Sequence, residues 1–316
     1  MKRATRQIDC RPRLPVICGP TAVGKTALAL DLAERFKMEV VSADSRQVYR
    51  GMDIGTAKPT PEEQKRVRHH LIDVVQPDED FHASRYAAMA SSAVRDILTR
   101  HARPLLVGGT GLYIKVLTQG LIRAPGADNA IRARLHDWTR TEGRQALYLR
   151  LTEVDPETAK RLHPNDLVRI VRALEVYELT GRTLSNFQKE HAFREQPYQT
   201  VTIGLNLDRE CLYERINRRA ESMFAQGLVE ETEHLLAQGY SPELKTMQTI
   251  GYTQAVAVLQ GRMTVQDAIE DLQRVTRRYA KQQITWFRQE KSIIWVDSSG
   301  DFATIRALID NFYAHL

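Results

Sequence analysis

The segment 19–26, with the sequence GPTAVGKT, constrains the fold of this chain more than any other. It fits the P-loop pattern G-x-x-x-x-G-K-[ST], which requires a buried strand before it and a helix after it. The apolar run 14–18 precedes the loop. Apolar residues at helical spacing follow it, at Ala27, Leu28, Leu30, Leu32, Ala33 and Phe36. The segment therefore predicts a strand, a glycine-rich loop and a helix.

The chemistry of such a loop is anion binding. Glycines let successive backbone amides converge on an anion, and the following helix presents the positive end of its dipole to the same point. Lys25 adds a positive charge, and Thr26 places a hydroxyl where a magnesium ion bridging two phosphates usually lies. We expect a diphosphate or triphosphate ligand and magnesium as the cofactor. The expected contacts are Gly19, Pro20, Thr21, Ala22, Val23, Gly24, Lys25 and Thr26.

Further strand-like and helix-like segments alternate up to about residue 121. Strands are predicted at 39–42 and 105–107, and a helix at 83–99. This order is typical of a parallel sheet covered by helices, whose ligands bind at the carboxyl ends of the strands.

Two of those strand ends carry candidate catalytic residues. Asp44 follows the second strand and is the leading candidate for a general base, although a helix N-cap or a magnesium ligand would suit an aspartate there equally well. The strand 105–107 runs into the residues 108–111, GGTG, instead of the aspartate that holds magnesium in P-loop ATPases and GTPases. This argues against a motor ATPase or a switch GTPase. Thr110 is the side-chain hydrogen-bond donor of that segment, and a plain turn is the alternative.

From about residue 125 the pattern is helical only, until Val201, Ile203 and Leu205 indicate a returning strand. The fold class is therefore α/β: a parallel sheet like that of P-loop nucleoside triphosphate hydrolases, with an inserted helical subdomain and a helical C-terminal part. We predict a flexible basic arm at 1–13, a core domain at 14–124 and 201–316, and the insertion at 125–200.

Basic residues give the chain a formal charge of +6, and three groups of them stand out. Arg169 and Arg172 share the polar side of one helix and could grip phosphates or simply be solvated. Arg219 falls in an inward-facing stripe and needs an anion, either a diphosphate or a buried acid. A stripe without acidic residues from 274 to 288 favours contact with a nucleic-acid backbone. Its members are Arg274, Arg277, Arg278, Lys281 and Arg288.

The remaining composition indicates the compartment. The apolar runs are shorter than the roughly 18 residues that a membrane-spanning helix needs. The three cysteines are widely spaced without a C-x-x-C pair, which favours a reducing cytoplasm. We expect a cytoplasmic monomer without membrane contact.

Five strings in order resemble the tRNA dimethylallyltransferase family, also called the tRNA isopentenyltransferase or IPP transferase family, from about 15 to 295. They are GPTAVGKT, SADSRQVYRGMDIGTAKP, LLVGGTGLY, HPNDLVRIVRALEV and RRYAKQQITWFR. The resemblance implies transfer of a dimethylallyl group from dimethylallyl diphosphate to the exocyclic amine of the adenosine 3′-adjacent to the anticodon in tRNA. The partners it implies are dimethylallyl diphosphate and the tRNA anticodon stem-loop.

The resemblance also implies roles for residues. Asp44 would accept a proton from the adenine amine, Thr110 would position the reacting groups, and Lys25 and Arg219 would stabilise the departing diphosphate. Family positions that contact tRNA map onto Asp44, Ser45, Arg46, Gln47, Thr110, Arg132, Val168, Arg169, Ile170, Val171, Arg172, Gln248, Thr249, Ile250, Gly251, Tyr252 and Thr253. Thr253 and Gln254 depart from the family's pattern, which has a charged residue there.

Three other functions fit parts of this pattern. A free-adenylate isopentenyltransferase would share the P-loop and Asp44 but would not need the basic stripe. A P-loop small-molecule kinase would transfer phosphate instead. A nucleotide-regulated RNA-binding module without catalysis would need the basic stripe and not Asp44.

Overall fold

The computed structural model describes residues 9–122, 124–192, 195–300 and 302–314. Within them a parallel sheet has the strand order β3-β2-β4-β1-β5-β6. The strands are β1 (Val16–Cys18), β2 (Met38–Ser42), β3 (His69–His70), β4 (Arg103–Gly108), β5 (Thr202–Asn206) and β6 (Ile294–Asp297). Because every pairing is parallel, the loops after β1, β2 and β4 leave the sheet at the same edge.

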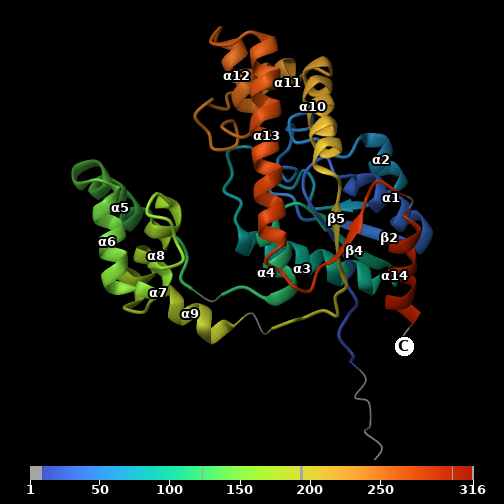
Figure 1. The fold of residues 1–316 in the computed structure, drawn as a ribbon, viewed down its shortest axis with the longest axis horizontal. Coiled ribbons are helices and arrows are strands. Elements are labelled where there is room, and N and C mark those ends of the chain that lie inside the picture. Colours follow the sequence, from blue (N-terminus) through green and yellow to red (C-terminus); the bar gives the residue numbers. More distant parts are fainter. Residues whose placement is uncertain (1–8, 123, 193–194, 301, 315–316) are drawn as a thin grey trace, which may run out of the picture. The chain divides into compact units, whose positions relative to one another are not determined.

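Helices cover this sheet and extend beyond it (Figure 1). They are α1 (Lys25–Phe36), α2 (Pro61–Arg66), α3 (Ala83–Thr99), α4 (Gly111–Gln119), α10 (Arg209–Ala225), α11 (Leu228–Ala237), α12 (Tyr252–Leu259), α13 (Val265–Phe287) and α14 (Ala303–Ala314). Apolar side chains of β1, β4, β5 and α1 form one buried core. The long α13 packs along α10 and α12 and carries one buried face.

Residues 119–196 form a second compact unit, separate from the unit made by 1–118 and 197–316. Its helices are α5 (Asn129–Glu142), α6 (Arg144–Val154), α7 (Pro156–Ala159), α8 (Leu167–Thr180) and α9 (Leu184–His191). They enclose their own core, which includes Leu135, Leu147 and Leu174. The unit begins where α4 ends, several residues before the predicted boundary at 125, and it ends at 196 instead of 200.

Most predicted elements lie where the sequence places them. The predicted helix 83–99 has the bounds of α3, and the returning strand is β5. The strand β6 and the helix α14 were not predicted. Residues 1–8 of the predicted basic arm lie outside the described residues. Residues 12 and 13 are held in place, since the Pro12 carbonyl accepts from Gln199 N at 2.9 Å and Arg13 forms a bridge with Gln199.

None of the described helices combines the length and the apolar character that crossing a membrane requires.

Candidate functional site

The P-loop joins β1 to α1 and leaves amides open to an anion. Gly24 takes the N-cap position with φ 108°, a left-handed conformation that favours glycine, and no described side chain caps the helix. A Cβ on Gly19 would lie 2.9 Å from the carbonyl oxygen of Leu205. The loop therefore passes close to β5, with the N-terminal amides of α1 at its mouth.

Lys25 and Arg219 bring two cations to this loop. The Lys25 Nζ donates to the carbonyl oxygens of Gly19 and Pro20, at 3.0 and 2.7 Å. Burial lowers the pKa of Lys25 to about 8, an effect that the charge of Asp44 opposes and that of Arg219 reinforces. Arg219 Nη1 donates to the Thr21 hydroxyl at 3.3 Å. Among the described residues no acid forms an ion pair with Arg219, and its guanidinium contacts the P-loop at Thr21. Of the two anions that the inward stripe left open, the described residues offer no buried acid.

Asp44 lies at the end of β2 with one oxygen fixed. Its Oδ1 accepts from the backbone N–H groups of Arg46 and Gln47, at 2.8 and 3.3 Å. It therefore caps a turn and not a helix. The described residues offer Oδ2 no hydrogen bond. The charge of Asp44 opposes the burial that lowers the pKa values of Lys25 and Arg219, so the carboxylate faces both cations.

Thr110 is held against the same loop. Its hydroxyl accepts from Ser45 N at 3.1 Å, and its own N–H donates to the Ala43 carbonyl oxygen at 3.0 Å. A Cβ on Gly108 would lie 2.1 Å from that carbonyl, so only glycine allows β4 to run this close. The structure thus brings Asp44 and Thr110 together, as the sequence predicts.

Tyrosines that the sequence analysis did not single out stand around Asp44. The rings of Tyr86 and Tyr113 stack with centroids 4.0 Å apart. Burial raises the pKa of Tyr279 to about 12, and the charge of Asp44 contributes to the rise. Burial and the charge of Asp44 likewise raise the pKa of Tyr113. These phenols stay protonated. Tyr86 and Tyr113 are 0% and 5% exposed and so belong to the core behind the site, whereas Tyr279 is half-buried.

Gln283 of α13 is a second residue that sequence reasoning missed. Its side chain lies between the P-loop and the residues 109–110. The sequence offers only its place on the otherwise apolar face of α13, which does not reveal its partners.

The segment 248–253 contains both exposed and buried residues. Gln248, Ile250 and Thr253 face solvent, whereas Thr249 and Tyr252 are buried. Tyr252 donates from its hydroxyl to Glu231 Oε1 at 2.6 Å. Its ring also lies 2.5 Å from where a Cβ on Gly55 would be. The Tyr252 side chain therefore belongs to the core in this conformation, and contact of the segment 248–253 with RNA stays a prediction.

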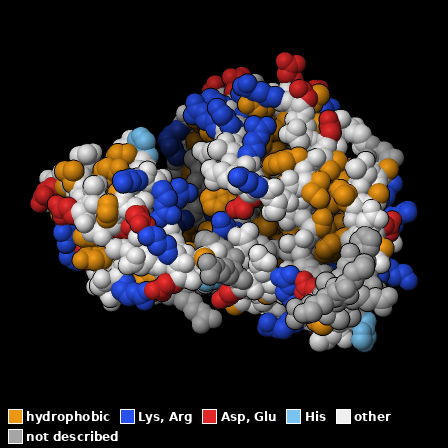
Figure 2. Space-filling model, turned by 60° about the horizontal axis from the view of Figure 1, so that its bottom comes forward, with side chains coloured by type: hydrophobic (Ala, Val, Ile, Leu, Met, Phe, Trp, Pro, Cys, Tyr) orange, Lys and Arg blue, Asp and Glu red, His pale blue; other side chains and the backbone are white. Residues whose placement is uncertain are grey.

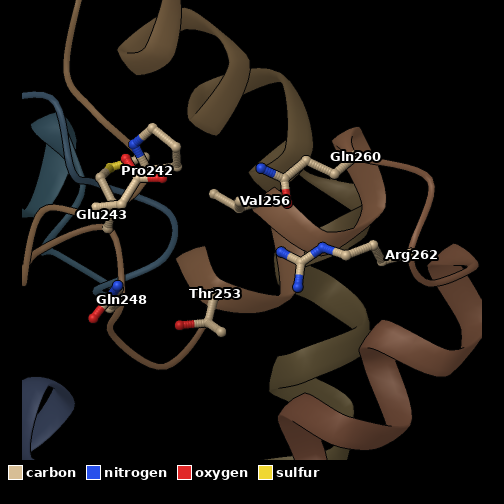
Figure 3. A pocket seen from close by; sticks show the side chains of 8 residues that line it. Pro242, Glu243, Gln248, Thr253, Val256, Gln260 and Arg262 are labelled. Atoms are coloured by element: carbon tan, nitrogen blue, oxygen red, sulfur yellow. The ribbon is translucent and has the colours of Figure 1, made fainter.

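An open cavity of about 450 Å³ adjoins this segment (Figure 3). Thr253, Gln248 and Gln260 contribute polar groups, Val256 contributes apolar surface, and Arg262 directs its guanidinium inward. The lining is completed by Pro242, Glu243 and Met247.

Within the insertion, the residues expected to contact RNA also differ in exposure. Arg132 and Arg172 both pair with Glu175, which is 0% exposed, with shortest N–O distances of 2.7 and 2.6 Å. Ile170 and Val171 are 0% and 3% exposed, so their side chains lie in the core of the insertion, and contact of the segment 168–172 with RNA stays a prediction. Val168 is 78% exposed, and the exposed Arg169 pairs with Asp166.

The basic stripe of α13 is partly exposed. Arg278, Lys281 and Arg288 face solvent, and Arg274 pairs with Asp271 one turn earlier. Arg277 instead donates to Asn217 Oδ1 at 2.6 Å and lies over the ring of Tyr213. On the face drawn in Figure 2, Lys and Arg side chains form clusters among acidic and hydrophobic side chains.

The described residues contain no group of three or more His, Cys, Asp or Glu that could hold a metal ion by itself. Thr26 is exposed at the start of α1. This donor set fits magnesium held mainly by phosphate oxygens and water, with one hydroxyl from the protein.

Comparison with known proteins places this site in context. The family model described as IPP transferase matches residues 47–290. The chain is 56% identical over 304 residues to tRNA dimethylallyltransferase 1 of Syntrophotalea carbinolica, covering 96% of this chain and 97% of that protein. It is 52% identical over 303 residues to tRNA dimethylallyltransferase of Geobacter metallireducens, covering 96% and 98%.

Solved structures give the same result. The crystal structure of the tRNA isopentenylpyrophosphate transferase of Bacillus halodurans is 42% identical with a TM-score of 0.69, covering 96% of each chain. A eukaryotic dimethylallyltransferase acting on tRNA is 28% identical with a TM-score of 0.77, covering 96% of this chain and 79% of that one.

Proposed function

The chain belongs to the IPP transferase family, and from that premise we propose that it transfers the dimethylallyl group of dimethylallyl diphosphate to the exocyclic amine of the adenosine 3′-adjacent to the anticodon in tRNA. One observation carries the proposal. A P-loop, two cations and the carboxylate of Asp44 converge at one edge of the sheet.

The reaction forms a carbon–nitrogen bond and breaks a carbon–oxygen bond. The adenine nitrogen attacks the allylic carbon, and the diphosphate leaves with the bonding electron pair. Because the nitrogen lone pair is delocalised into the ring, the reaction needs alignment, a base and a stabilised leaving group.

Asp44 supplies the base. Two backbone N–H groups fix its Oδ1. Its Oδ2 accepts the proton that the amine loses. Thr110, held against the same loop, positions the reacting groups.

The P-loop supplies the leaving-group site. Amides at the start of α1, Lys25 and Arg219 bind the diphosphate and offset its charge. Magnesium would be held by the Thr26 hydroxyl and diphosphate oxygens, and it would add positive charge on the leaving group.

RNA binding completes the proposal. The target adenosine must leave its stack to reach Asp44, at a cost of a few kcal/mol. Exposed Arg278 and Lys281 of α13, together with Gln248 and Thr253, provide contacts that offset this cost. Tyr279, half-buried on α13 and near enough to Asp44 for its charge to raise the tyrosine pKa, offers aromatic surface to the flipped base. We propose that the enzyme works as a monomer in the cytoplasm, where tRNA is found.

The test is to incubate the purified protein with magnesium, labelled dimethylallyl diphosphate and an anticodon stem-loop. Label is expected on the RNA, and excess AMP should not compete. Label on AMP instead would favour an adenylate isopentenyltransferase. Transfer of phosphate from ATP would indicate a kinase, and both results would contradict the proposal.

A further inference from the structure

Gln283 connects two loops of the site through one buried amide. Its Oε1 accepts from the backbone N–H of Thr21 at 2.9 Å, and its Nε2 donates to the carbonyl oxygen of Gly109 at 2.9 Å. The side chain is 7% exposed. One amide therefore bridges the P-loop and the residue that precedes Thr110.

The bridge requires both an acceptor and a donor at a fixed spacing, which the glutamine amide provides. Space at the bridge is tight as well. A Cβ on Gly109 would lie 2.4 Å from Gln283 Nε2. One turn later on α13, Trp286 Nε1 would lie 2.0 Å from a Cβ on Gly111. Glycine at 109 and 111 thus lets α13 pack directly on this loop.

Thr21 is consequently held from two sides. Gln283 of α13 accepts from its N–H, and Arg219 of α10 donates to its hydroxyl at 3.3 Å. Since α10 and α13 pack together, the position of the P-loop is set by these helices as well as by β1 and α1.

We propose that Gln283 is a positioning residue that sets the spacing between the diphosphate loop and Thr110. Both polar atoms of its amide are engaged by Thr21 and Gly109, and it acts through these two residues. This inference rests on the proposed function, because it assumes that the P-loop binds the diphosphate of the donor.

The test measures binding of inorganic diphosphate with magnesium by calorimetry, for the wild type and for Gln283→Met and Gln283→Glu. The methionine variant leaves the Thr21 N–H without its acceptor, and roughly tenfold weaker binding is expected. The glutamate variant should bind more weakly still, because it places two oxygens together and adds negative charge beside the anion. If Gln283 acted through packing alone, Gln283→Glu would bind diphosphate more tightly than Gln283→Met, because glutamate is closer to glutamine in shape and keeps one acceptor.

Matched controls separate the possible outcomes. Gln282→Met alters the exposed neighbour on α13 and should bind diphosphate like the wild type. Gly109→Ala places a Cβ against Gln283 Nε2 and should also weaken diphosphate binding. This variant tests the same bridge if a Gln283 variant does not fold. Stem-loop affinity should stay unchanged in all variants. If both Gln283→Met and Gly109→Ala bound diphosphate with wild-type affinity, the role of Gln283 would be overturned and the proposed function would stand. If the wild type bound no diphosphate, both the role of Gln283 and the proposed function would be overturned.

Discussion

Asp44 is fixed through its Oδ1, and the described residues leave its Oδ2 without a hydrogen bond. Asparagine in its place keeps a carbonyl oxygen for the N–H groups of Arg46 and Gln47 but cannot take a proton at neutral pH. Asp44→Asn should therefore lower turnover by about 10²- to 10⁴-fold, the usual contribution of a general base, with little change in stem-loop affinity. Single-turnover label transfer and an RNA-binding titration measure the two quantities.

The exposed Asp78 provides the control, since Asp78→Asn should be neutral. If Asp44→Asn retained the wild-type rate, another group would have to remove the proton.

Lys25 gives donor binding a pH dependence whose sign follows from its environment. Burial lowers its pKa to about 8 in the free protein, and a bound diphosphate would raise that pKa again. Below pH 8 the lysine is charged in both states, so donor affinity is constant. Above pH 8 binding requires proton uptake, and affinity should fall by up to about tenfold per pH unit. Donor KM measured between pH 6.5 and 9.5 should rise only in the upper half.

Arginine remains charged over this range. Lys25→Arg should therefore remove the rise in KM above pH 8, whatever its effect on the absolute value. A rise of equal size in the variant would assign the titration to another group.

Some residues of the site could be predicted from the sequence and others could not. The P-loop could be predicted because the spacing of its residues defines it, and the place of Asp44 could be predicted because it follows a strand of a parallel sheet. Gln283 could not, because its partners Thr21 and Gly109 are more than 170 positions away. The burial of the Tyr252 side chain could not be predicted either, because its place in the segment 248–253 does not reveal the distant Glu231 that accepts from its hydroxyl.

At the scale of elements, α13 combines a buried face with an exposed basic stripe. Lys281 is exposed without an acidic partner among the described residues, whereas Arg277 donates to Asn217. Lys281→Ala should weaken stem-loop binding and reduce the slope of log affinity against log salt by roughly 0.7 to 0.9.

Arg277→Ala should instead lower thermal stability and change the salt slope less. Stem-loop titrations at several salt concentrations, paired with melting curves, compare the two variants. Equal salt slopes for the wild type and Lys281→Ala would exclude a phosphate contact by that lysine.

Helices and strands were predictable to different degrees. The helix α3 has strong apolar periodicity, and its bounds agree with those predicted from the sequence. The edge strand β6 was not predicted, because its exposed and half-buried residues lack a clear alternating pattern.

At the scale of the whole molecule, the insertion has a core of its own and a buried charge at its centre. Burial alone would raise the pKa of Glu175, but hydrogen bonds from Arg132 and Arg172 outweigh it and leave that pKa lowered. The carboxylate therefore stabilises the folded insertion above the ordinary pKa of a glutamate, and this contribution is lost as the pH falls through the lowered value.

Glu175→Gln should lower the free energy of unfolding by about 1–3 kcal/mol, because glutamine keeps only one oxygen acceptor, removes the negative charge and turns an NH2 group toward the donors Arg132 Nη2 and Arg172 Nη1. Urea unfolding of the full chain at pH 7 measures this, with the exposed Glu178→Gln as control, because Glu178 pairs with the exposed Arg134. Equal losses in the two variants would show that the buried cluster contributes no more than a surface ion pair.

The most direct measurement compares two anticodon stem-loops in the presence of labelled dimethylallyl diphosphate and magnesium. One carries adenosine 3′ to the anticodon, and the other carries purine riboside there, which lacks the exocyclic amine. The account predicts that both RNAs bind with similar affinity and that label appears only on the adenosine, at its exocyclic nitrogen. Label on the purine riboside RNA, or no label on either, would contradict it.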